Sequence, residues 1–369
     1  MLYRKYKADR LFTGTEVLSN DQVLITNEKG VVEAIVHESE AGENVLYHNG
    51  WIVPGLVNAH CHIELSHMKD VIPQHTGMVD FLLGILKQRR AEPEQIYDAI
   101  RKAEEEMVAN GIVAVGDICN TADSLCVKRD PKLHYHSFVE VIGIVAETAN
   151  ETFQQAETVL NKFRMNEVSY RHSLSENGKI SDAKIVSSSL TPHAPYTVSP
   201  ALMKLIGDAT AGQIISMHNE ESRAENELFR TKNGDFIRLF EFLGIDESQL
   251  FMEGASSLVY WLPYFDQQHQ IIMVHNVDMG DGDINFIRRL IQEGRITPPW
   301  CCVCPGANLY IQNQLPDFNL LYNSGLNMVI GTDSLSSNTS LDILKEIRTI
   351  HKAAPSIPLE EIFKWATIN

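Results

Sequence analysis

The stretch PGLVNAHCH at positions 54–62 decides the expected fold, because a continuous apolar run ends here in two histidines. A short apolar run without alternation is typical of a strand that is buried on both faces, as in a parallel sheet. His60 and His62 stand two residues apart, so on an extended chain both imidazoles lie on one face and can reach one ion. The stretch therefore predicts a buried strand that ends in part of a metal site.

Seven further runs of this kind follow, and helical segments lie between most of them. The eight expected strands are Ile52–Ala59, Ile112–Ile118, His136–Ile142, Ile185–Leu190, Gln213–Met217, Gln270–Val274, Trp300–Val303 and Asn327–Ile330. Spacing of about 3.6 residues predicts helices that include Glu94–Asn110, Glu151–Met165, Pro200–Ala209 and Gly282–Glu293. Strands and helices that alternate in series predict an α/β protein, and eight units favour a closed (β/α)8 TIM-type barrel over residues 51–369.

Two segments depart from this repeat. Residues 1–50 carry short β-branched runs punctuated by Gly and Asn, and they predict a small antiparallel β-sandwich domain without a helix. The segment 222–265 is longer than a connection between two barrel strands requires, so we expect a helical insertion at the barrel mouth.

Composition limits the classes of partner. The chain has 369 residues, 44% of them hydrophobic, and a formal net charge of -17. An acidic surface argues against nucleic acid or an anionic membrane as the main partner. No apolar run approaches the ~20 residues of a membrane span, and none follows the N-terminus as in a signal peptide. We therefore expect a cytoplasmic protein.

The ends of the expected strands carry the residues with chemistry, and in such barrels catalytic groups lie at the carboxyl ends of strands. Histidines end four of the eight strands, and an aspartate ends a fifth: His60 and His62, His193, His218, His275 and Asp333. Several such groups at one barrel mouth would be costly without an ion or substrate to satisfy them. Three imidazoles and a carboxylate suit one divalent ion, with zinc the first choice and iron or manganese as alternatives.

These residues lie in motifs that resemble the amidohydrolase superfamily, in the branch of cytosine, guanine and S-adenosylhomocysteine deaminases and triazine chlorohydrolases. In detail the chain resembles bacterial proteins related to aminodeoxyfutalosine deaminase. The motifs occur in the family order and span residues 51–340. They are PGLVNAHCH (54–62), PHAPYT (192–197), HNEE (218–221), VHN (274–276), CPGANL (304–309) and GTDSLSSN (331–338).

The resemblance implies a role for each residue. The metal ligands would be His60, His62, His218 and Asp333. Glu221 would protonate a ring nitrogen, with Glu220 as the neighbour that could be mistaken for it. Asp333 would also take the proton of the attacking water and pass it to the leaving group. His275 would hydrogen-bond the hydroxide on the ion or the tetrahedral intermediate, and His193 would contact the substrate.

Two further expectations concern the number of ions and the pocket wall. Binuclear members of the superfamily bridge two ions through a carboxylated lysine at the end of strand four, whereas here Lys184 stands at the start of that strand, so a single ion is expected. Glu64 lies two residues past His62 on the same face of an extended segment, which makes it a candidate substrate-binding residue. Family members continue beyond the last barrel helix with strands that complete the small sheet. Because this chain stops at Asn369, we expect an incomplete sheet with exposed edges.

The sequence leaves three functions open. The first is hydrolytic deamination of an aminated purine, pyrimidine or nucleoside-like heterocycle by hydroxide on the metal, with release of ammonia. The second is hydrolysis of a cyclic amide, an imide or a chlorinated ring with the same groups. The third is a metal-binding barrel without catalysis. Substitution of a metal ligand or of Glu221 would favour this third function, but these residues are all present. The resemblance also implies a small heterocyclic substrate and a homodimer.

Overall fold

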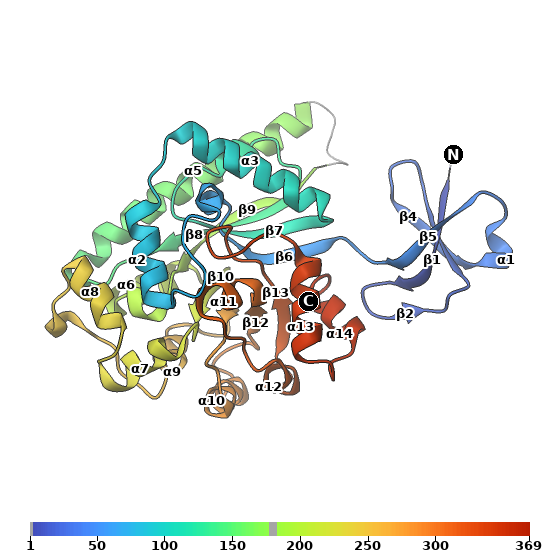
Figure 1. Cartoon of the computed structure of the whole chain (residues 1–369). Coiled ribbons are helices and arrows are strands. Elements are labelled where there is room, and N and C mark those ends of the chain that lie inside the picture. Colours follow the sequence, from blue (N-terminus) through green and yellow to red (C-terminus); the bar gives the residue numbers. More distant parts are fainter. Residues whose placement is uncertain (1–2, 177–182) are drawn as a thin grey trace.

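The computed structural model describes residues 3–176 and 183–369 and places a small sheet beside a larger α/β barrel (Figure 1). The small sheet contains β1 (Arg4–Phe12), β2 (Val17–Leu18), β3 (Gln22–Thr26), β4 (Val32–His37) and β5 (Val45–Ile52). Its strands run in the order β2-β1-β3-β4, and β5 pairs with β1. It is one five-stranded sheet, and large apolar side chains of β4 and β5, such as Val32 and Leu46, are exposed.

The prediction of a purely antiparallel, helix-free segment is wrong in two details. The pairing of β5 with β1 is parallel. A one-turn helix, α1 (Glu38–Ala41), precedes β5, and the His37 imidazole accepts the Ser39 N–H at its start. One turn is too short to produce a hydrophobic period, so only the cap could have indicated it.

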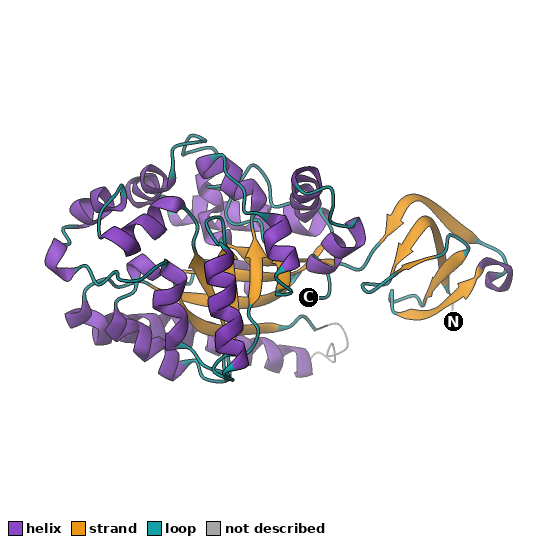
Figure 2. Cartoon of the chain, turned by 90° about the horizontal axis from the view of Figure 1, so that it is seen from below, coloured by secondary structure: helices purple, strands orange, loops and turns teal. Residues whose placement is uncertain are grey.

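The barrel strands confirm the predicted eight, with small changes of boundary. They are β6 (Leu56–Cys61), β7 (Ile112–Cys119), β8 (His134–Val141), β9 (Val186–Pro192), β10 (Ile214–Asn219), β11 (Gln270–His275), β12 (Trp300–Val303) and β13 (Asn327–Ile330). All hydrogen-bonded pairs within β6–β9 and within β10–β13 are parallel. Figure 2 shows these strands enclosed by helices.

Hydrogen bonds at two seams close the barrel. Between β9 and β10, the Thr191 hydroxyl oxygen accepts the Ser216 N–H at 2.7 Å, so a side chain bridges the strands. Between the end of β13 and β6, the His60 carbonyl accepts the N–H groups of Thr332 and Asp333 at 3.1 and 3.0 Å. The second seam ties a metal-ligand candidate on the first barrel strand to another on the last.

The first barrel strand starts later than predicted. The expected strand Ile52–Ala59 is divided between β5, which ends at Ile52, and β6, which begins at Leu56. Pro54 has no N–H to give to a sheet, and a Cβ on Gly55 would lie 2.3 Å from Val113. The connection between the two sheets therefore passes through residues 53–55.

The helices lie around the strands and at the barrel mouth. Those outside the insertion are α2 (Met78–Gln88), α3 (Pro93–Ala109), α4 (Leu125–Lys128), α5 (Ala149–Glu176), α6 (Pro200–Ala209), α10 (Asp281–Gln292), α11 (Pro305–Gln312), α12 (Phe318–Asn323), α13 (Ile343–Ala353) and α14 (Leu359–Trp365). Short 3-10 turns occur at η1 (Ile63–Met68), η2 (Ala146–Thr148), η4 (Pro195–Thr197), η5 (Glu247–Gln249) and η6 (Leu262–Tyr264). None of the described helices combines the length and apolarity that a membrane crossing requires.

Residues 222–265 form the predicted helical insertion. It contains α7 (Arg223–Thr231), α8 (Phe236–Leu243) and α9 (Ser257–Trp261). Buried apolar side chains of α8 pack with those of α2, including Leu239 and Phe240 with Phe81. This cluster is separate from the main barrel core and covers the side of the barrel on which the strands end (Figure 1).

A fully buried ion pair lies between β7 and α4. The Lys128 ammonium is 2.5 Å from the Asp117 carboxylate, and both side chains are completely inaccessible to solvent. We expect Lys128→Met to lower the free energy of unfolding by about 3–5 kcal/mol, because it leaves Asp117 as an uncompensated buried charge. Denaturant unfolding measures this change. The control is Lys132→Met at an exposed pair with Glu105, where we expect about 1 kcal/mol or less. Equal effects of the two substitutions would contradict the prediction.

Candidate active site

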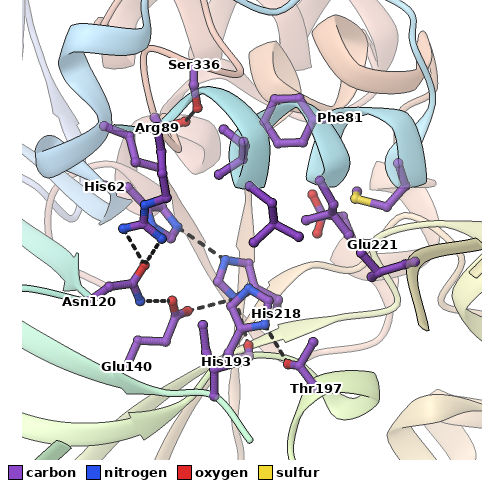
Figure 3. A pocket seen from close by; sticks show the side chains of 18 of the residues that line it. His62, Phe81, Arg89, Asn120, Glu140, His193, Thr197, His218, Glu221 and Ser336 are labelled. Atoms are coloured by element: carbon purple, nitrogen blue, oxygen red, sulfur yellow. Dashed lines mark hydrogen bonds and ion pairs between the residues drawn. The ribbon is translucent and has the colours of Figure 1, made fainter. Parts of the chain in front are cut away.

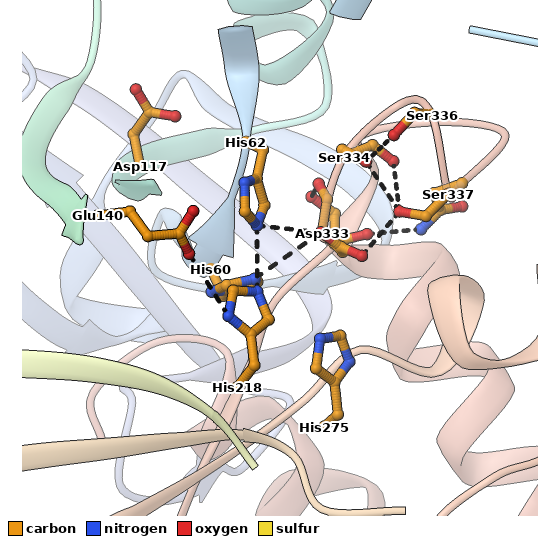
Figure 4. Close-up of polar contacts among 12 residues, drawn as sticks. His60, His62, Asp117, Glu140, His218, His275, Asp333, Ser334, Ser336 and Ser337 are labelled. Carbon is orange, nitrogen blue, oxygen red and sulfur yellow. Dashed lines mark hydrogen bonds and ion pairs between the residues drawn. The ribbon is translucent and has the colours of Figure 1, made fainter. Parts of the chain in front are cut away.

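Three histidines from two barrel strands meet at the barrel mouth (Figure 4). His60 and His62 come from the end of β6, and His218 comes from β10. Each offers one ring nitrogen, these three nitrogens lie within 4.8 Å of one another, and the Nε2 atoms of His62 and His218 are 3.3 Å apart. The alternation of β6 brings His60 and His62 to one side, as the sequence predicts.

Asp333 completes the cluster from the loop after β13. Its Oδ1 is 3.5 Å from His62 Nε2 and 3.8 Å from His60 Nε2. The Ser337 hydroxyl donates to Oδ2 at 2.7 Å, which fixes the carboxylate and leaves Oδ1 facing the histidines. Ser337 lies within a motif that the sequence analysis quotes, yet nothing in the pattern assigns it this role.

The spacing and the unpaired nitrogens fit a divalent ion. Ligands about 2.05 Å from a tetrahedral zinc are about 3.3–3.4 Å apart, close to the His62–His218 separation. Both ring nitrogens of the fully buried His60 lack a hydrogen-bond partner. Burial lowers the pKa of His60 and His62 well below the usual value and that of His218 to about 4. All three imidazoles are thus neutral, which is the form that binds metal.

Two neighbouring groups, a backbone carbonyl and a carboxylate, fix the tautomer of His218. Its Nδ1 donates to the His193 carbonyl oxygen at 2.7 Å, and Glu140 Oε1 lies 3.6 Å from the same nitrogen. The unprotonated Nε2 therefore faces the cluster. Partners of this kind orient metal-binding histidines and raise their basicity. Glu140, His193 and His218 also lie close enough to hold an ion, but the bond to the carbonyl occupies His218 Nδ1.

Glu221 and His275 lie side by side next to the histidine cluster. His275 Nε2 is 3.4 Å from Glu221 Oε1. The Asn308 amide donates to His275 Nδ1 at 3.1 Å, so the ring proton is on Nε2. Burial raises the pKa of Glu221 well above the usual value, and the Asp333 carboxylate raises it further. The structure thus brings together a protonatable carboxyl group and an N–H donor, as the motifs predict.

Glu220 points away from this group although it is adjacent to Glu221. Its Oε1 accepts from the Asn226 amide at 3.1 Å, on the side of α7. Glu225 of α7 accepts the backbone N–H groups of both Glu220 and Glu221, at 3.1 and 3.0 Å. This carboxylate fixes the turn that separates the two side chains, so Glu221 alone of the pair reaches the cavity.

The backbone at the strand ends is strained. Asp333, His275 and Glu220 have φ angles of 59°, 76° and 46°, in the left-handed region that favours glycine. Such conformations cost about 1–3 kcal/mol each and cluster at functional sites, where surrounding structure holds them. At this barrel mouth they turn the side chains of Asp333 and His275 toward the histidine cluster.

A cavity of about 180 Å³ opens beside the cluster (Figure 3). One wall is apolar and includes Phe81 and Ile85 of α2 and Leu239 and Leu243 of α8. The polar lining comprises His62, Arg89, Asn120, Glu140, His193, Thr197, His218, Glu221, His275, Asp333, Ser334 and Ser336. The cavity thus places an apolar surface opposite a set of hydrogen-bonding groups, which is typical of small-molecule sites.

His193 lines the cavity, as predicted for a substrate contact. Its Nδ1 is 2.6 Å from the Thr197 hydroxyl oxygen, and that hydroxyl donates to the Ala194 carbonyl. His193 Nδ1 is therefore the donor to Thr197. Its Nε2 remains as an acceptor.

Glu64 is not among the residues that line this cavity. Its buried carboxylate accepts the N–H groups of Asn120 and Thr121, both at 3.1 Å, and pairs with Arg89 at 3.3 Å. Arg89 follows α2 and does line the cavity. Arg89 is not among the predicted site residues because α2, which it follows, is not among the predicted helices. The apolar run MVDFLLGIL at 78–86 is the signal that could have revealed this helix.

The fold and the site together define an α/β barrel with a metal centre at the carboxyl ends of its strands. A model of the amidohydrolase family matches residues 51–369. The chain therefore belongs to the amidohydrolase family, which confirms the resemblance that the motifs carry.

Named relatives are deaminases. The chain is 24% identical to an adenosine deaminase of Helicobacter pylori over 328 residues, which are 88% of this chain and 73% of that protein. Among solved structures, aminofutalosine deaminase of H. pylori in complex with methylthio-coformycin has a TM-score of 0.77 at 21% identity, covering 98% of this chain and 84% of that one. An adenosine deaminase of Xanthomonas campestris with bound zinc has a TM-score of 0.64 at 20% identity, covering 95% and 74%. At this identity the structural likeness concerns the fold.

Proposed function

We propose that the protein is a metal-dependent deaminase that hydrolyses the exocyclic amino group of a purine-like or nucleoside-like heterocycle and releases ammonia. The observation that carries the proposal is the position of Glu221, a buried carboxyl group beside His275 and the histidine cluster. The attacking water must lose both of its protons as its oxygen becomes the product carbonyl, while the ring nitrogen gains one proton and the leaving amine gains the other. The site holds two carboxyl groups for this work, Glu221 and Asp333.

The ligands in this proposal are His60, His62, His218 and Asp333. They hold one divalent ion, for which we propose zinc because a zinc-containing adenosine deaminase shares the fold and the donor set suits zinc. Such an ion acts as a Lewis acid and lowers the pKa of a coordinated water to about 7.

Asp333 moves the proton of the attacking water. Ser337 holds its Oδ2, and its Oδ1 faces the histidines, so the carboxylate is fixed beside the place of the attacking water. Burial raises the pKa of Asp333 to about 6 when no ion is bound. A carboxylate in this position can accept a proton and then release it to the departing amine.

Glu221 supplies the proton on the other side of the reacting carbon. Its raised pKa favours the protonated carboxyl group, which can donate to the ring nitrogen next to the C–NH2 carbon. His275 has its proton on Nε2 and donates a hydrogen bond to the oxygen that becomes the product carbonyl. His193 Nε2 accepts from a donor of the substrate.

The apolar wall of α2 and α8 supports a substrate with an apolar substituent beyond the heterocycle. Two elements far apart in sequence contribute to it, and their buried apolar side chains belong to one cluster beside the cavity. Named relatives include deaminases of adenosine, of 5-methylthioadenosine and S-adenosylhomocysteine, and of 5′-deoxyadenosine. We therefore place 5′-substituted adenosines first among the candidates.

An ammonia-release screen tests the proposal. Protein loaded with Zn²⁺ is incubated with adenosine, 5′-methylthioadenosine, adenine, guanine and cytosine, and ammonia and product mass are measured. We expect ammonia and replacement of the amino group by oxygen for at least one adenine derivative. A chlorinated ring compound and a cyclic amide are tested alongside these. If they release chloride or undergo ring opening while no aminated compound releases ammonia, the protein is instead a hydrolase of chlorinated rings or cyclic amides.

Removal of the metal should lower the thermal stability of the protein. A ligand present at about 1,000 times its dissociation constant stabilises the folded state by about 4 kcal/mol. We therefore expect chelator-treated protein to melt several degrees below protein with excess Zn²⁺, as measured by thermal unfolding. His218→Ala is the control, because it removes one ligand and should abolish most of the difference. An equal Zn²⁺-dependent shift in that variant would contradict the ligand assignment.

A further inference from the structure

Asp117 and Lys128 make hydrogen bonds to other residues in addition to their buried ion pair. Asp117 lies on β7 and Lys128 at the end of α4, and neither lines the active-site cavity. The Lys128 ammonium donates to Asp117 Oδ2, to the Ser137 hydroxyl at 2.8 Å and to the Ser124 hydroxyl at 3.0 Å. All three of its protons thus have oxygen partners, which fixes the ammonium in one place.

The other oxygen of Asp117 binds the backbone next to a candidate metal ligand. Asp117 Oδ1 accepts the Ile63 N–H at 2.9 Å. Ile63 directly follows His62, where β6 ends and the η1 turn begins. The bond therefore holds the peptide that links His62 to the turn, at the point where the chain could otherwise rotate.

We propose that Asp117 is a positioning residue of the metal centre, which fixes His62 through the Ile63 peptide while Lys128 orients the Asp117 carboxylate. The inference rests on the part of the proposed function that assigns the ligands, and it does not depend on the substrate. Groups behind metal ligands that set their orientation typically change metal affinity about 10- to 100-fold when they are removed.

Chemistry explains why a carboxylate occupies this position. Asp117 accepts hydrogen bonds on both oxygens at once, from Lys128 on Oδ2 and from Ile63 on Oδ1. An amide has one acceptor and one donor end, so beside Lys128 it would turn its oxygen to the ammonium and its NH2 group to the Ile63 N–H. Without the ammonium, the amide oxygen is free to accept from Ile63, while the NH2 group takes the place of Oδ2, which lies 3.3 Å from the Cys119 sulfur.

Two double variants test this by measuring the dissociation constant for Zn²⁺ alone, in competition with a chromogenic chelator. D117N/K128M and D117L/K128M both remove the buried charges, and their side chains at position 117 have the same number and branching of heavy atoms. Replacing a buried ion pair by neutral groups usually preserves folding. Only the asparagine of D117N/K128M can accept the Ile63 N–H. We expect D117N/K128M to bind Zn²⁺ about as tightly as the unchanged protein and D117L/K128M to bind about 10- to 100-fold more weakly.

The control is Glu104→Leu. Glu104 is buried and accepts the Lys132 N–H at 3.2 Å and the Tyr135 hydroxyl at 3.1 Å, and neither contact involves a candidate ligand or the Ile63 peptide. It should leave the Zn²⁺ dissociation constant unchanged. Equal constants for the two double variants, or an equal loss in Glu104→Leu, would overturn the proposal. If leucine at position 117 prevents folding, D117A/K128M makes the same comparison. No measurement involves substrate, so a failed deaminase assay leaves the result intact.

Discussion

Asp333→Asn is expected to reduce kcat for ammonia release by about 10³-fold or more while the fold remains intact. The Ser337 hydroxyl donates to Oδ2, so the amide oxygen of the introduced asparagine would take that place and its NH2 group would face the histidines. The variant then loses the proton acceptor and presents a donor where an ion needs a lone pair. The measurement is kcat at saturating Zn²⁺, together with metal content and thermal unfolding.

Asp342→Asn is the matched control for Asp333→Asn. Asp342 caps α13 by accepting the Leu344 and Lys345 N–H groups, and asparagine caps helices about as well as aspartate. Activity and stability should therefore stay near those of the unchanged protein. Retained turnover in Asp333→Asn would refute the role of Asp333 as the proton acceptor.

Glu221→Gln should lower kcat by about 10²- to 10⁴-fold, the usual contribution of a general acid or base. Glutamine keeps the size of the side chain and can still face His275, but it cannot deliver a proton to a ring nitrogen. Glu221 is outside the histidine and aspartate cluster, so Zn²⁺ content and KM should change little. Steady-state kinetics and metal analysis on the same preparation separate these effects.

Glu220→Gln distinguishes Glu221 from its neighbour. Burial raises the pKa of Glu220 well above the usual value, so the side chain is neutral and an amide replaces it with little change. Its contact with Asn226 lies outside the cavity. We expect nearly full activity. A large loss in Glu220→Gln with little loss in Glu221→Gln would reverse the assignment of the acid.

Much of the barrel could be predicted because each strand carries its own signal. Runs such as IIMV at 271–274 are apolar without alternation, and all eight predicted runs correspond to strands. The N-terminal boundary at residue 50, the homodimer and the cytoplasmic location stay predictions. The errors occur where the pattern is weak. The helix α1 is a single turn, and the predicted strand Ile52–Ala59 spans the end of one strand and the start of the next, with Pro54 between them.

The candidate ligands could be predicted for a related reason. Parallel strands in a closed barrel end on one side, so the strand-end residues His60, His62, His218 and Asp333 must approach each other once the barrel closes. By contrast, Glu64 lies on the predicted face of its segment, yet a turn after His62 directs its carboxylate to the backbone of residues 120 and 121.

The sequence by itself determined the order of strands and helices, the residues at the strand ends and the motifs of the amidohydrolase family, because these depend on local pattern and on chain order. Only the tertiary structure decided which side chains share a partner. The turn held by Glu225 sends Glu221 to the cavity and Glu220 away, and packing of α2 on α8 forms the apolar wall. Asp117 and Lys128 likewise meet next to the Ile63 peptide that follows His62. Contacts between elements depend on the direction in which each backbone turn points its side chains, and a residue pattern does not encode that direction.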